Sequence, residues 1–423
     1  QAPQTARMPQ PHTPRAAFPL FAALLAAAPH RLLFFVGACN VLLAMGWWLA
    51  WLVDARWHAI GLPTDGPWAG WMHAFVMQYQ LLPPFMFGFL LTVFPRWMGL
   101  PELSRWHYVP VGAGLFGGQL AVLGGMLLGQ PAMVLVGVLM STAGWGYGLV
   151  QLLRLLLAER RAHRGPTWHA WSAFAAMALG LAGLLCMLAS LFDAGPWPVF
   201  IAIKLGSFGL LLPIYLTVAH RMFPFFAGNV VAGYRPWRPL WLLGAAWCLL
   251  LGHLGLEWAH AYAWLWPVDA TLAVGSTWVL WRWWPRNQAP GLLWVLFAGF
   301  AWLPAAFALY ATQSVLYGIT GEFLLGRGPA HALYIGFFGS LLVAMVTRVT
   351  QGHSGQPLAM PAVGWFAFAA LQLVAVVRIG SEVVADALAW NAVAAAGWLL
   401  AFLPWVLRST AIYLRPRVDG RPG

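Results

Sequence analysis

Long apolar runs, separated by short polar segments, follow one another along almost the whole chain. A bilayer-spanning helix needs about 20 mostly apolar residues. Runs of this kind lie at about 30–53, 68–93, 107–128, 131–157, 168–190, 197–219, 238–256, 262–284, 290–312, 329–350, 359–379 and 385–407. The pattern predicts an all-α polytopic membrane protein with twelve transmembrane helices. The predicted organisation is an N-terminal segment at 1–29, a transmembrane domain at 30–407 and a tail at 408–423.

Arginine is distributed unequally between the two sides that these spans define. The side that carries both termini holds 19 arginines, and the opposite side holds only Arg56, Arg327 and Arg378. Cytoplasmic loops of membrane proteins carry an excess of Lys and Arg. Both the segment at 1–29 and the tail at 408–423 are therefore predicted to be cytoplasmic.

Composition supports a membrane protein and changes how the net charge is interpreted. Charged residues make up 8% of the chain and hydrophobic residues 61%, whereas soluble domains carry about 25% charged residues. The formal charge of +12 is explained by cytoplasmic arginine, so the predicted partner is the lipid bilayer and not nucleic acid. The sequence contains no C-x-x-C-H motif for covalent haem attachment.

The cytoplasmic ends of the second, sixth and tenth predicted spans resemble one another. Each carries an arginine, and these arginines are separated by 221−96 = 125 and 348−221 = 127 residues. The repeat predicts a pseudo-threefold arrangement of four-helix units. The alternative is a chance match among arginines placed by membrane topology. The segments read LTVFPRW with Arg96, LTVAHRM with Arg221 and VAMVTRV with Arg348.

Two histidines lie near the non-cytoplasmic ends of the second and tenth predicted spans. His73 and His331 fall at similar depth, and ionisable residues inside a membrane are usually functional. Two opposed imidazoles are suited to the axial positions of a haem b iron. Gly339, eight residues after His331 and on the same helix face, is expected to leave room for the macrocycle. The alternative is that each is an interfacial histidine bonded to a carbonyl or water.

A haem also needs cations for its propionates, and few are available on that side. Arg378 ends the eleventh predicted span and Arg327 precedes the tenth. Charge-assisted hydrogen bonds from these guanidinium groups would suit propionate. The alternative is that both are solvated loop charges.

Three other ionisable residues are candidates within the predicted spans. Lys204 and Asp269 lie at matching depths in the sixth and eighth spans, and an ion pair between them would lower the cost of both charges. His253, near the non-cytoplasmic end of the seventh span, is a candidate copper ligand because imidazole suits copper. The alternative for His253 is an ordinary packed histidine, since no paired-histidine motif accompanies it.

Several longer segments resemble the NnrS family of bacterial membrane proteins. The resemblance rests on HALYIGFFGSLLVAMVTRVTQGHSGQPL (331–358), RMFPFFAGN (221–229), GFLLTVFPRWMGLP (88–101), FAGFAWLP (297–304) and PHRLLFFVGA (29–38). The first contains the family's histidine, arginine and G-H-S/T-G-x-P-L pattern, here His331, Arg348 and His353. The resemblance implies an inner-membrane protein that holds haem and copper and acts in the response to nitric oxide and nitrosative stress.

The sequence also departs from that family. The family's second span usually begins W-H-A-H-E-M, whereas this chain reads WMHAFVMQY around His73. A family histidine of the ninth span is Phe297 here. The layout is also similar to the main subunit of haem-copper oxidases, in which histidines of spans two and ten hold a low-spin haem. His73, His331 and Arg378 match that pattern, but the histidines of an oxidase copper site are not matched.

These observations leave three functions open, and they assign no catalytic residue. The first is a haem protein that acts in the nitric oxide response by electron transfer, by sensing or by protection of iron centres, with a respiratory protein as the candidate electron-transfer partner. The second is a transporter, which the interrupted segment LLPPFMFG (81–88) would suit. The third is a structural subunit of a larger respiratory complex.

Overall fold

The computed structural model describes residues 17–420 except 65 and 164, and in that part of the chain every regular element is a helix. The first elements are α1 (Ala17–Leu25), α2 (Pro29–Trp57), α3 (Ala69–Phe75), η2 (Val76–Leu81) and α4 (Pro83–Met98). They are followed by α5 (Val109–Leu128), α6 (Pro131–Arg161), α7 (Trp168–Leu191), α8 (Trp197–Lys204), η4 (Leu205–Leu211), α9 (Leu212–Val230), α10 (Leu240–Trp258) and α11 (Trp266–Trp283). The last are α12 (Gly291–Phe300), α13 (Trp302–Thr320), α14 (Gly328–His331), η6 (Ala332–Gly339), α15 (Ser340–Ser354), α16 (Ala362–Gly380) and α17 (Ala387–Tyr413).

The prediction of an all-α polytopic membrane protein is confirmed. Within the described residues, 11 helical segments are long and apolar enough to cross a membrane. Each coincides with one of the predicted spans. The remaining predicted span, 262–284, corresponds to α11, an 18-residue helix that is too polar to be counted with the others. Twelve membrane crossings therefore remain a prediction.

Three of the spans contain a π-helical segment. These segments are η2 in the second span, η4 in the sixth and η6 in the tenth. Pro83 follows η2 and Pro213 follows η4, each in the first turn of the next helix. Proline donates no backbone hydrogen bond and its ring clashes with the carbonyl four residues earlier, which disturbs the regular α-helical pattern immediately before it. π-Helical turns are rare and occur frequently at functional sites.

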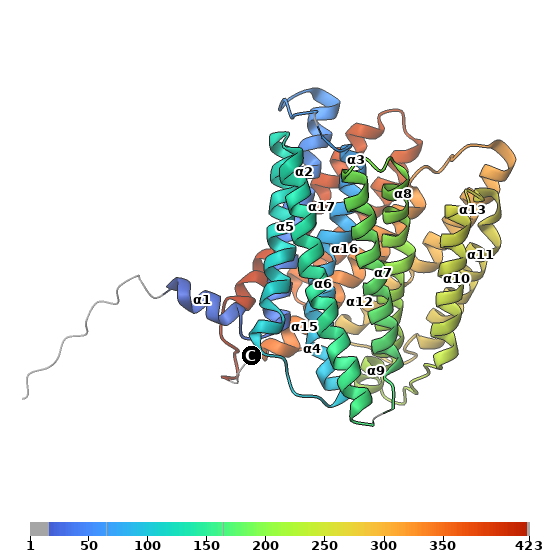
Figure 1. Cartoon of the computed structure of the whole chain (residues 1–423). Coiled ribbons are helices and arrows are strands. Elements are labelled where there is room, and N and C mark those ends of the chain that lie inside the picture. The colour runs from blue at the N-terminus through green and yellow to red at the C-terminus, as the bar shows by residue number, and fades with distance from the viewer. Residues whose placement is uncertain (1–16, 65, 164, 421–423) are drawn as a thin grey trace, which may run out of the picture.

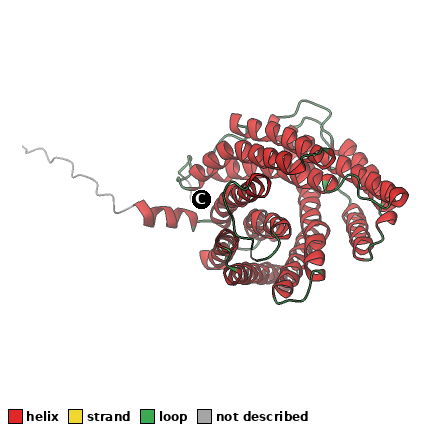
Figure 2. Ribbon diagram, turned by 90° about the horizontal axis from the view of Figure 1, so that it is seen from above, coloured by secondary structure: helices red, strands yellow, loops and turns green. Residues whose placement is uncertain are grey.

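The same three spans form the centre of the bundle. In their most apolar stretches, 89% of the positions are buried in Ala69–Met98, 67% in Trp197–Val230 and 78% in Gly328–Ser354. The other spans have 28% to 56% of such positions buried. Figure 2, viewed from above, shows the helices of the bundle surrounding others inside. The central position of these spans explains why polar side chains on them can meet away from lipid.

Peripheral helices close the bundle and extend it to one side. The helices α2 and α17, from opposite ends of the chain, pack against each other, and α17 also packs against α16. Figure 1 shows α10, α11 and α13 grouped at the side of the bundle opposite α1. Within this group α11 packs mainly on α13, and α10 lies nearest α9 and η4.

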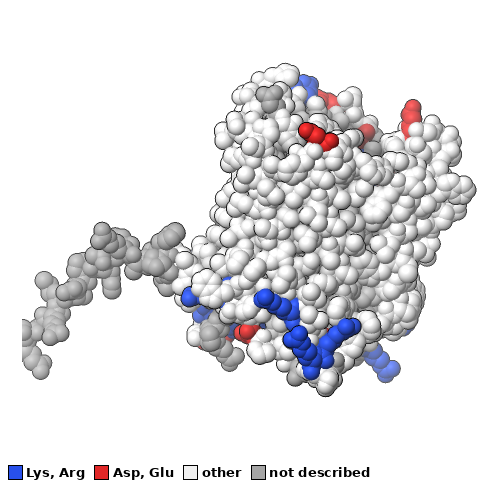
Figure 3. Space-filling model, in the orientation of Figure 1, with Lys and Arg blue, Asp and Glu red and all other residues white. Residues whose placement is uncertain are grey.

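Charged side chains gather at the two ends of the bundle and are sparse between them. Figure 3 shows Lys and Arg concentrated at the end where α4 and α9 terminate, and Asp and Glu mainly at the other end. Four of the 19 arginines in the topology argument, Arg7, Arg15, Arg164 and Arg421, lie outside the described residues. The charge distribution agrees with the orientation expected from the positive-inside rule.

The described part of the N-terminal segment begins with α1, whose sequence is AFPLFAALL. Figure 1 shows that this helix projects sideways from the arginine-rich end of the bundle. A short apolar helix in this position is suited to the membrane interface. The end of α17 lies at the same end of the molecule.

Candidate functional site

A cavity of about 470 Å³ lies between the central spans, at the end that is poor in arginine. Its wall includes His73, His331, Arg327 and Arg378. The structure thus brings together the four residues that the sequence suggested for a haem and its propionates. The volume lies within the range of about 300–1,000 Å³ that is typical of cofactor and ligand sites.

The ring of His331 is oriented by the backbone of the preceding turn. Its Nδ1 lies 2.9 Å from the carbonyl oxygen of Arg327. A carbonyl can only accept, so Nδ1 carries the proton and the other ring nitrogen, Nε2, has a free lone pair. Histidines that bind metals usually donate their second N–H to a carbonyl or carboxylate in this way.

The ring of His73 is oriented by stacking. It packs on Trp48 with a centroid separation of 4.0 Å and an interplanar angle of 14°. Trp48 lies on α2 and also lines the cavity. A neutral imidazole has one protonated ring nitrogen, so the other ring nitrogen of His73 keeps a lone pair that can bind a metal.

Three cationic side chains line the cavity wall. Lys204, Arg327 and Arg378 line it, and no Asp or Glu of the described residues does. Arg378 pairs with Glu382 at 2.5 Å. No described carboxylate lies within ion-pair distance of Arg327, which stands over the ring of Trp68. This wall is suited to an anionic group.

The glycine predicted to make room for a macrocycle lies on this wall. A methyl group added at Gly339 would meet its nearest neighbour, the Tyr334 carbonyl oxygen, at 3.5 Å, which is an ordinary contact. Gly339 thus lines the cavity at a position where a methyl group would make only ordinary contacts.

A polar cluster joins the three π-helical segments at the floor of the cavity. The Gln78 amide donates to Ser207 Oγ at 3.1 Å and also contacts the Tyr334 hydroxyl. Ser207 and Tyr334 are themselves hydrogen-bonded. Each of the three residues is the third of its π segment, and their separations are 207−78 = 129 and 334−207 = 127 residues. We call this set the polar hub.

The hub was not predicted, although a signal for it was present in the sequence. The intervals between the hub residues resemble those between the repeated arginines. Aligning the three spans on their arginines would therefore also have brought Gln78, Ser207 and Tyr334 close to matching positions. Two of the repeated arginines also contact aromatic rings that follow another repeated arginine in the sequence. Arg221 lies over Trp97 at 4.3 Å and Arg348 over Phe226 at 3.8 Å, while Arg96 pairs with Glu102 at 3.3 Å. These contacts agree with three related units, and the pseudo-threefold arrangement itself stays a prediction.

Comparison with known families decides what kind of membrane protein carries this cavity. The NnrS protein family matches residues 24–417, nearly the whole chain. This chain belongs to the NnrS family. Comparison with curated protein sequences returns no significant match. The NnrS signature residues His331 and Arg348 lie at the two ends of the span that contains η6.

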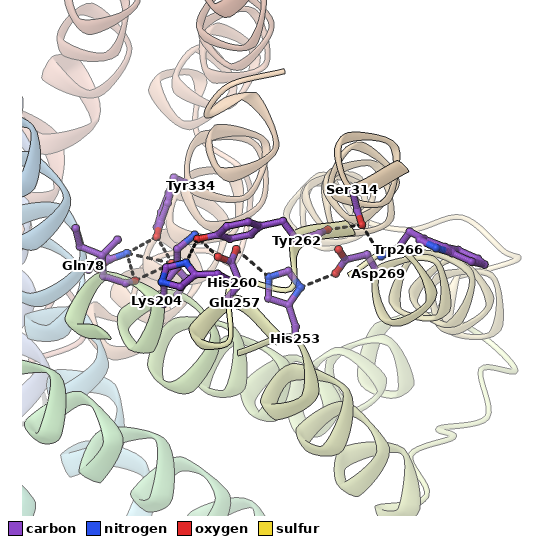
Figure 4. A network of polar contacts seen from close by, with 12 residues as sticks. Gln78, Lys204, His253, Glu257, His260, Tyr262, Trp266, Asp269, Ser314 and Tyr334 are labelled. Atoms are coloured by element: carbon purple, nitrogen blue, oxygen red, sulfur yellow. Dashed lines mark hydrogen bonds and ion pairs between the residues drawn. The ribbon is translucent and has the colours of Figure 1, made fainter. Parts of the chain in front are cut away.

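The predicted ion pair between Lys204 and Asp269 is wrong for this NnrS chain. Lys204 Nζ lies 2.8 Å from Glu257 Oε2, and Asp269 Oδ1 lies 2.6 Å from His253 Nδ1. Figure 4 shows how His253 stands between the two carboxylates. Glu257 is the penultimate residue of α10 and was placed in a loop by the predicted span of 238–256. The two predicted partners are therefore joined only through two other side chains.

The same arrangement bears on His253 as a copper ligand. Both of its ring nitrogens face carboxylates, Nδ1 that of Asp269 and Nε2 that of Glu257 at 3.5 Å. No group of three or more His, Cys, Asp or Glu side chains suited to a metal ion is found in the described part of the chain. These residues do not fit a copper site, so we do not propose one at His253.

The histidines at the arginine-rich end form close pairs. His353 stacks on His30 with centroids 4.0 Å apart. His169 Nε2 lies 2.8 Å from His220 Nδ1, and His220 Nε2 donates to the Pro239 carbonyl at 3.0 Å. The family-matched residue His353 is thus packed against another ring.

Proposed function

We propose that the cavity binds one haem b, with His73 and His331 as the axial ligands of its iron. The observation that carries the proposal is that two imidazoles, 258 positions apart in the sequence (331−73 = 258), line one cavity at the same end of the central spans. Imidazole on both axial faces is a recognised mode of haem binding.

The surrounding residues support this cofactor. Arg327 and Arg378 supply the cations for two propionates. Trp48, Trp71 and Trp398 form an aromatic wall suited to a flat apolar ring. The Arg327 carbonyl keeps the His331 proton on Nδ1, so that Nε2 is the ligating nitrogen.

A haem held in this way supplies one-electron redox chemistry. If His73 and His331 both bound the iron, no open position would be left for a gas, and such a site would favour electron transfer. We therefore propose an electron-transfer role within the nitric oxide response of the NnrS family, in a bacterial inner membrane with both termini cytoplasmic and with a respiratory protein as electron partner. The arrangement of His73, His331 and Arg378 is the one that resembles the low-spin haem site of haem-copper oxidases.

The test is the absorption spectrum of the full chain, expressed with haem supplied and purified in detergent. We expect a low-spin b-type spectrum, one haem per chain in a pyridine haemochrome assay, and loss of that haem in His73→Ala. Copper analysis of the same samples reports on the second metal that the family implies. A folded wild-type protein that lacks haem would refute the proposal.

A transporter is the second candidate, favoured by the π-helical segments of three central helices beside a cavity lined by three cationic side chains. Discontinuous helices at the membrane midplane are typical of transporter binding sites. Uptake of a small organic anion into liposomes that contain the protein but no redox partner would support this alternative.

A third candidate, a structural subunit of a respiratory complex, is tested by native co-purification.

A further inference from the structure

Four ionisable side chains form a continuous row that starts at the cavity and runs into the bundle. We call it the buried ionic row, and its members in order are Lys204, Glu257, His253 and Asp269 (Figure 4). The side chain of Lys204 is 27% exposed and the other three are between 0% and 4% exposed. Buried charges in a membrane are expensive and commonly mark proton pathways.

The row lies directly behind the cavity wall. The ring of Phe208, which lines the cavity, stacks on His253 with centroids 3.8 Å apart. Tyr310, another residue of the wall, meets the same imidazole edge-on at 5.4 Å. His253 is therefore separated from the cavity by a single aromatic layer, across which a change of charge is felt strongly because little water intervenes.

The geometry of His253 defines two states of the row that differ by one proton. The short contact between Nδ1 and Asp269 Oδ1, 2.6 Å, requires one proton between those atoms. Nε2 lies 3.5 Å from Glu257 Oε1 and forms no hydrogen bond to a described residue. With Nε2 unprotonated the four groups carry a net charge of −1, and with Nε2 protonated they are neutral.

One ring nitrogen of His253 faces a carboxylate without a hydrogen atom that is already committed to a described acceptor. Asp269 Oδ2 and His253 Nε2 are buried without a hydrogen-bond partner among the described residues. An unpaired nitrogen facing a carboxylate is the arrangement expected of a site that accepts a proton.

The other titratable groups that face the row are tyrosines and one exposed histidine. Tyr310 approaches from α13, and Tyr262 and His260 lie in the connection between α10 and α11, where they bond to each other at 2.5 Å. The hub residue Tyr334 is hydrogen-bonded to Ser207 and Gln78. None of these groups adds a third carboxylate or a second lysine, so the charge of the row is set by its own four members.

We propose that the buried ionic row takes up one proton from water when one electron enters the cavity, which makes electron transfer in this protein proton-coupled. This inference rests on the proposed function. A respiratory one-electron donor supplies the electron. Lys204 passes a proton from Nζ to Glu257 Oε2 and regains one from water at the cavity; the Glu257 carboxyl group then rotates and passes that same proton to His253 Nε2. One electron and one proton enter, and no other bond is broken.

The test is the midpoint potential of the bound haem in the full-length protein, measured as a function of pH. For the wild type we expect the potential to fall with rising pH, with a slope that approaches about 59 mV for each tenfold change in proton concentration. Asp269→Asn, His253→Gln and Glu257→Gln should flatten the slope. These changes are near-isosteric. Because three positions are tested, the experiment remains decisive even if one of the variants fails to fold.

The matched control is Glu322→Gln, which removes a carboxylate from an exposed loop at the same end of the molecule and should retain the wild-type slope. Haem binding with equal slopes in the wild type and the row variants would overturn this inference alone. A wild-type protein that binds no haem would overturn the proposed function and this inference with it.

Discussion

The two ends of the bundle use paired histidines in different ways. At the arginine-rich end His30 and His353 stack at 4.0 Å, and His169 and His220 share a hydrogen bond of 2.8 Å. At the other end His73 and His331 line a cavity of about 470 Å³. Rings in direct contact leave no room for a planar cofactor, whereas His73 and His331 both border a cavity. The space between two histidines is therefore more informative than their presence in a span.

The largest expected effect comes from removing one imidazole of the cavity pair. His73→Ala or His331→Ala should weaken haem retention by at least about 100-fold, because loss of a mere hydrogen-bond partner of a metal ligand already costs 10–100-fold. The measurement is haem per chain after dialysis against a haem-binding protein. His30→Ala and His169→Ala serve as controls and should retain haem. Equal losses in all four variants would remove the distinction between the two ends.

Filling the cavity without touching a ligand should have the next largest effect. Gly339→Phe is expected to reduce haem affinity roughly tenfold, because overpacking costs about 1–3 kcal/mol and 1.4 kcal/mol corresponds to a factor of ten. Gly339→Ala, whose methyl group meets only ordinary contacts, should be tolerated. Gly146→Phe is the matched control, since nothing lies within 4 Å of an added methyl group there. Unchanged haem binding in Gly339→Phe would show that the macrocycle lies elsewhere.

The charge of the cavity wall should be visible in the redox potential. Arg327→Ala removes a cation without a described carboxylate partner, and should lower the haem midpoint potential by roughly 50 mV, about the Coulomb energy of one charge at 10 Å in a medium of intermediate dielectric. Arg56→Ala is the control, because Arg56 pairs with Asp386 at the surface with 42% of each side chain exposed. A potential that does not respond to Arg327 would place the haem away from this wall.

The smallest effect concerns the polar hub beneath the cavity. Tyr334→Phe removes the hydroxyl that contacts Gln78 and Ser207, and should lower the free energy of unfolding by about 0.6–1.7 kcal/mol, the range for hydrogen bonds between membrane helices. The measurement is unfolding in mixed detergent micelles. Tyr215→Phe, whose hydroxyl bonds to no described residue, should change stability less. Equal stability of the two variants would argue that the hub contributes little to joining the three spans.

The sequence predicted the features that depend on position along the chain. Each of the twelve apolar runs is helical in the structure, because the bilayer demands about 20 apolar residues and satisfied backbone groups at each crossing. The placement of His73 and His331 at similar depth also followed from counting residues. Their convergence on one cavity agrees with that expectation, and haem binding stays a prediction.

The tertiary structure alone decided which side chains meet. Lys204 pairs with Glu257 and not with Asp269, because the choice depends on the rotation of α8 and α10 about their axes and on an extra half-turn at the end of α10, neither of which hydropathy reports. The polar hub likewise exists only because three π-helical turns rotate Gln78, Ser207 and Tyr334 toward one point. Lipid solvation acts on each helix separately and is recorded in the sequence, whereas partner choice arises from packing among helices.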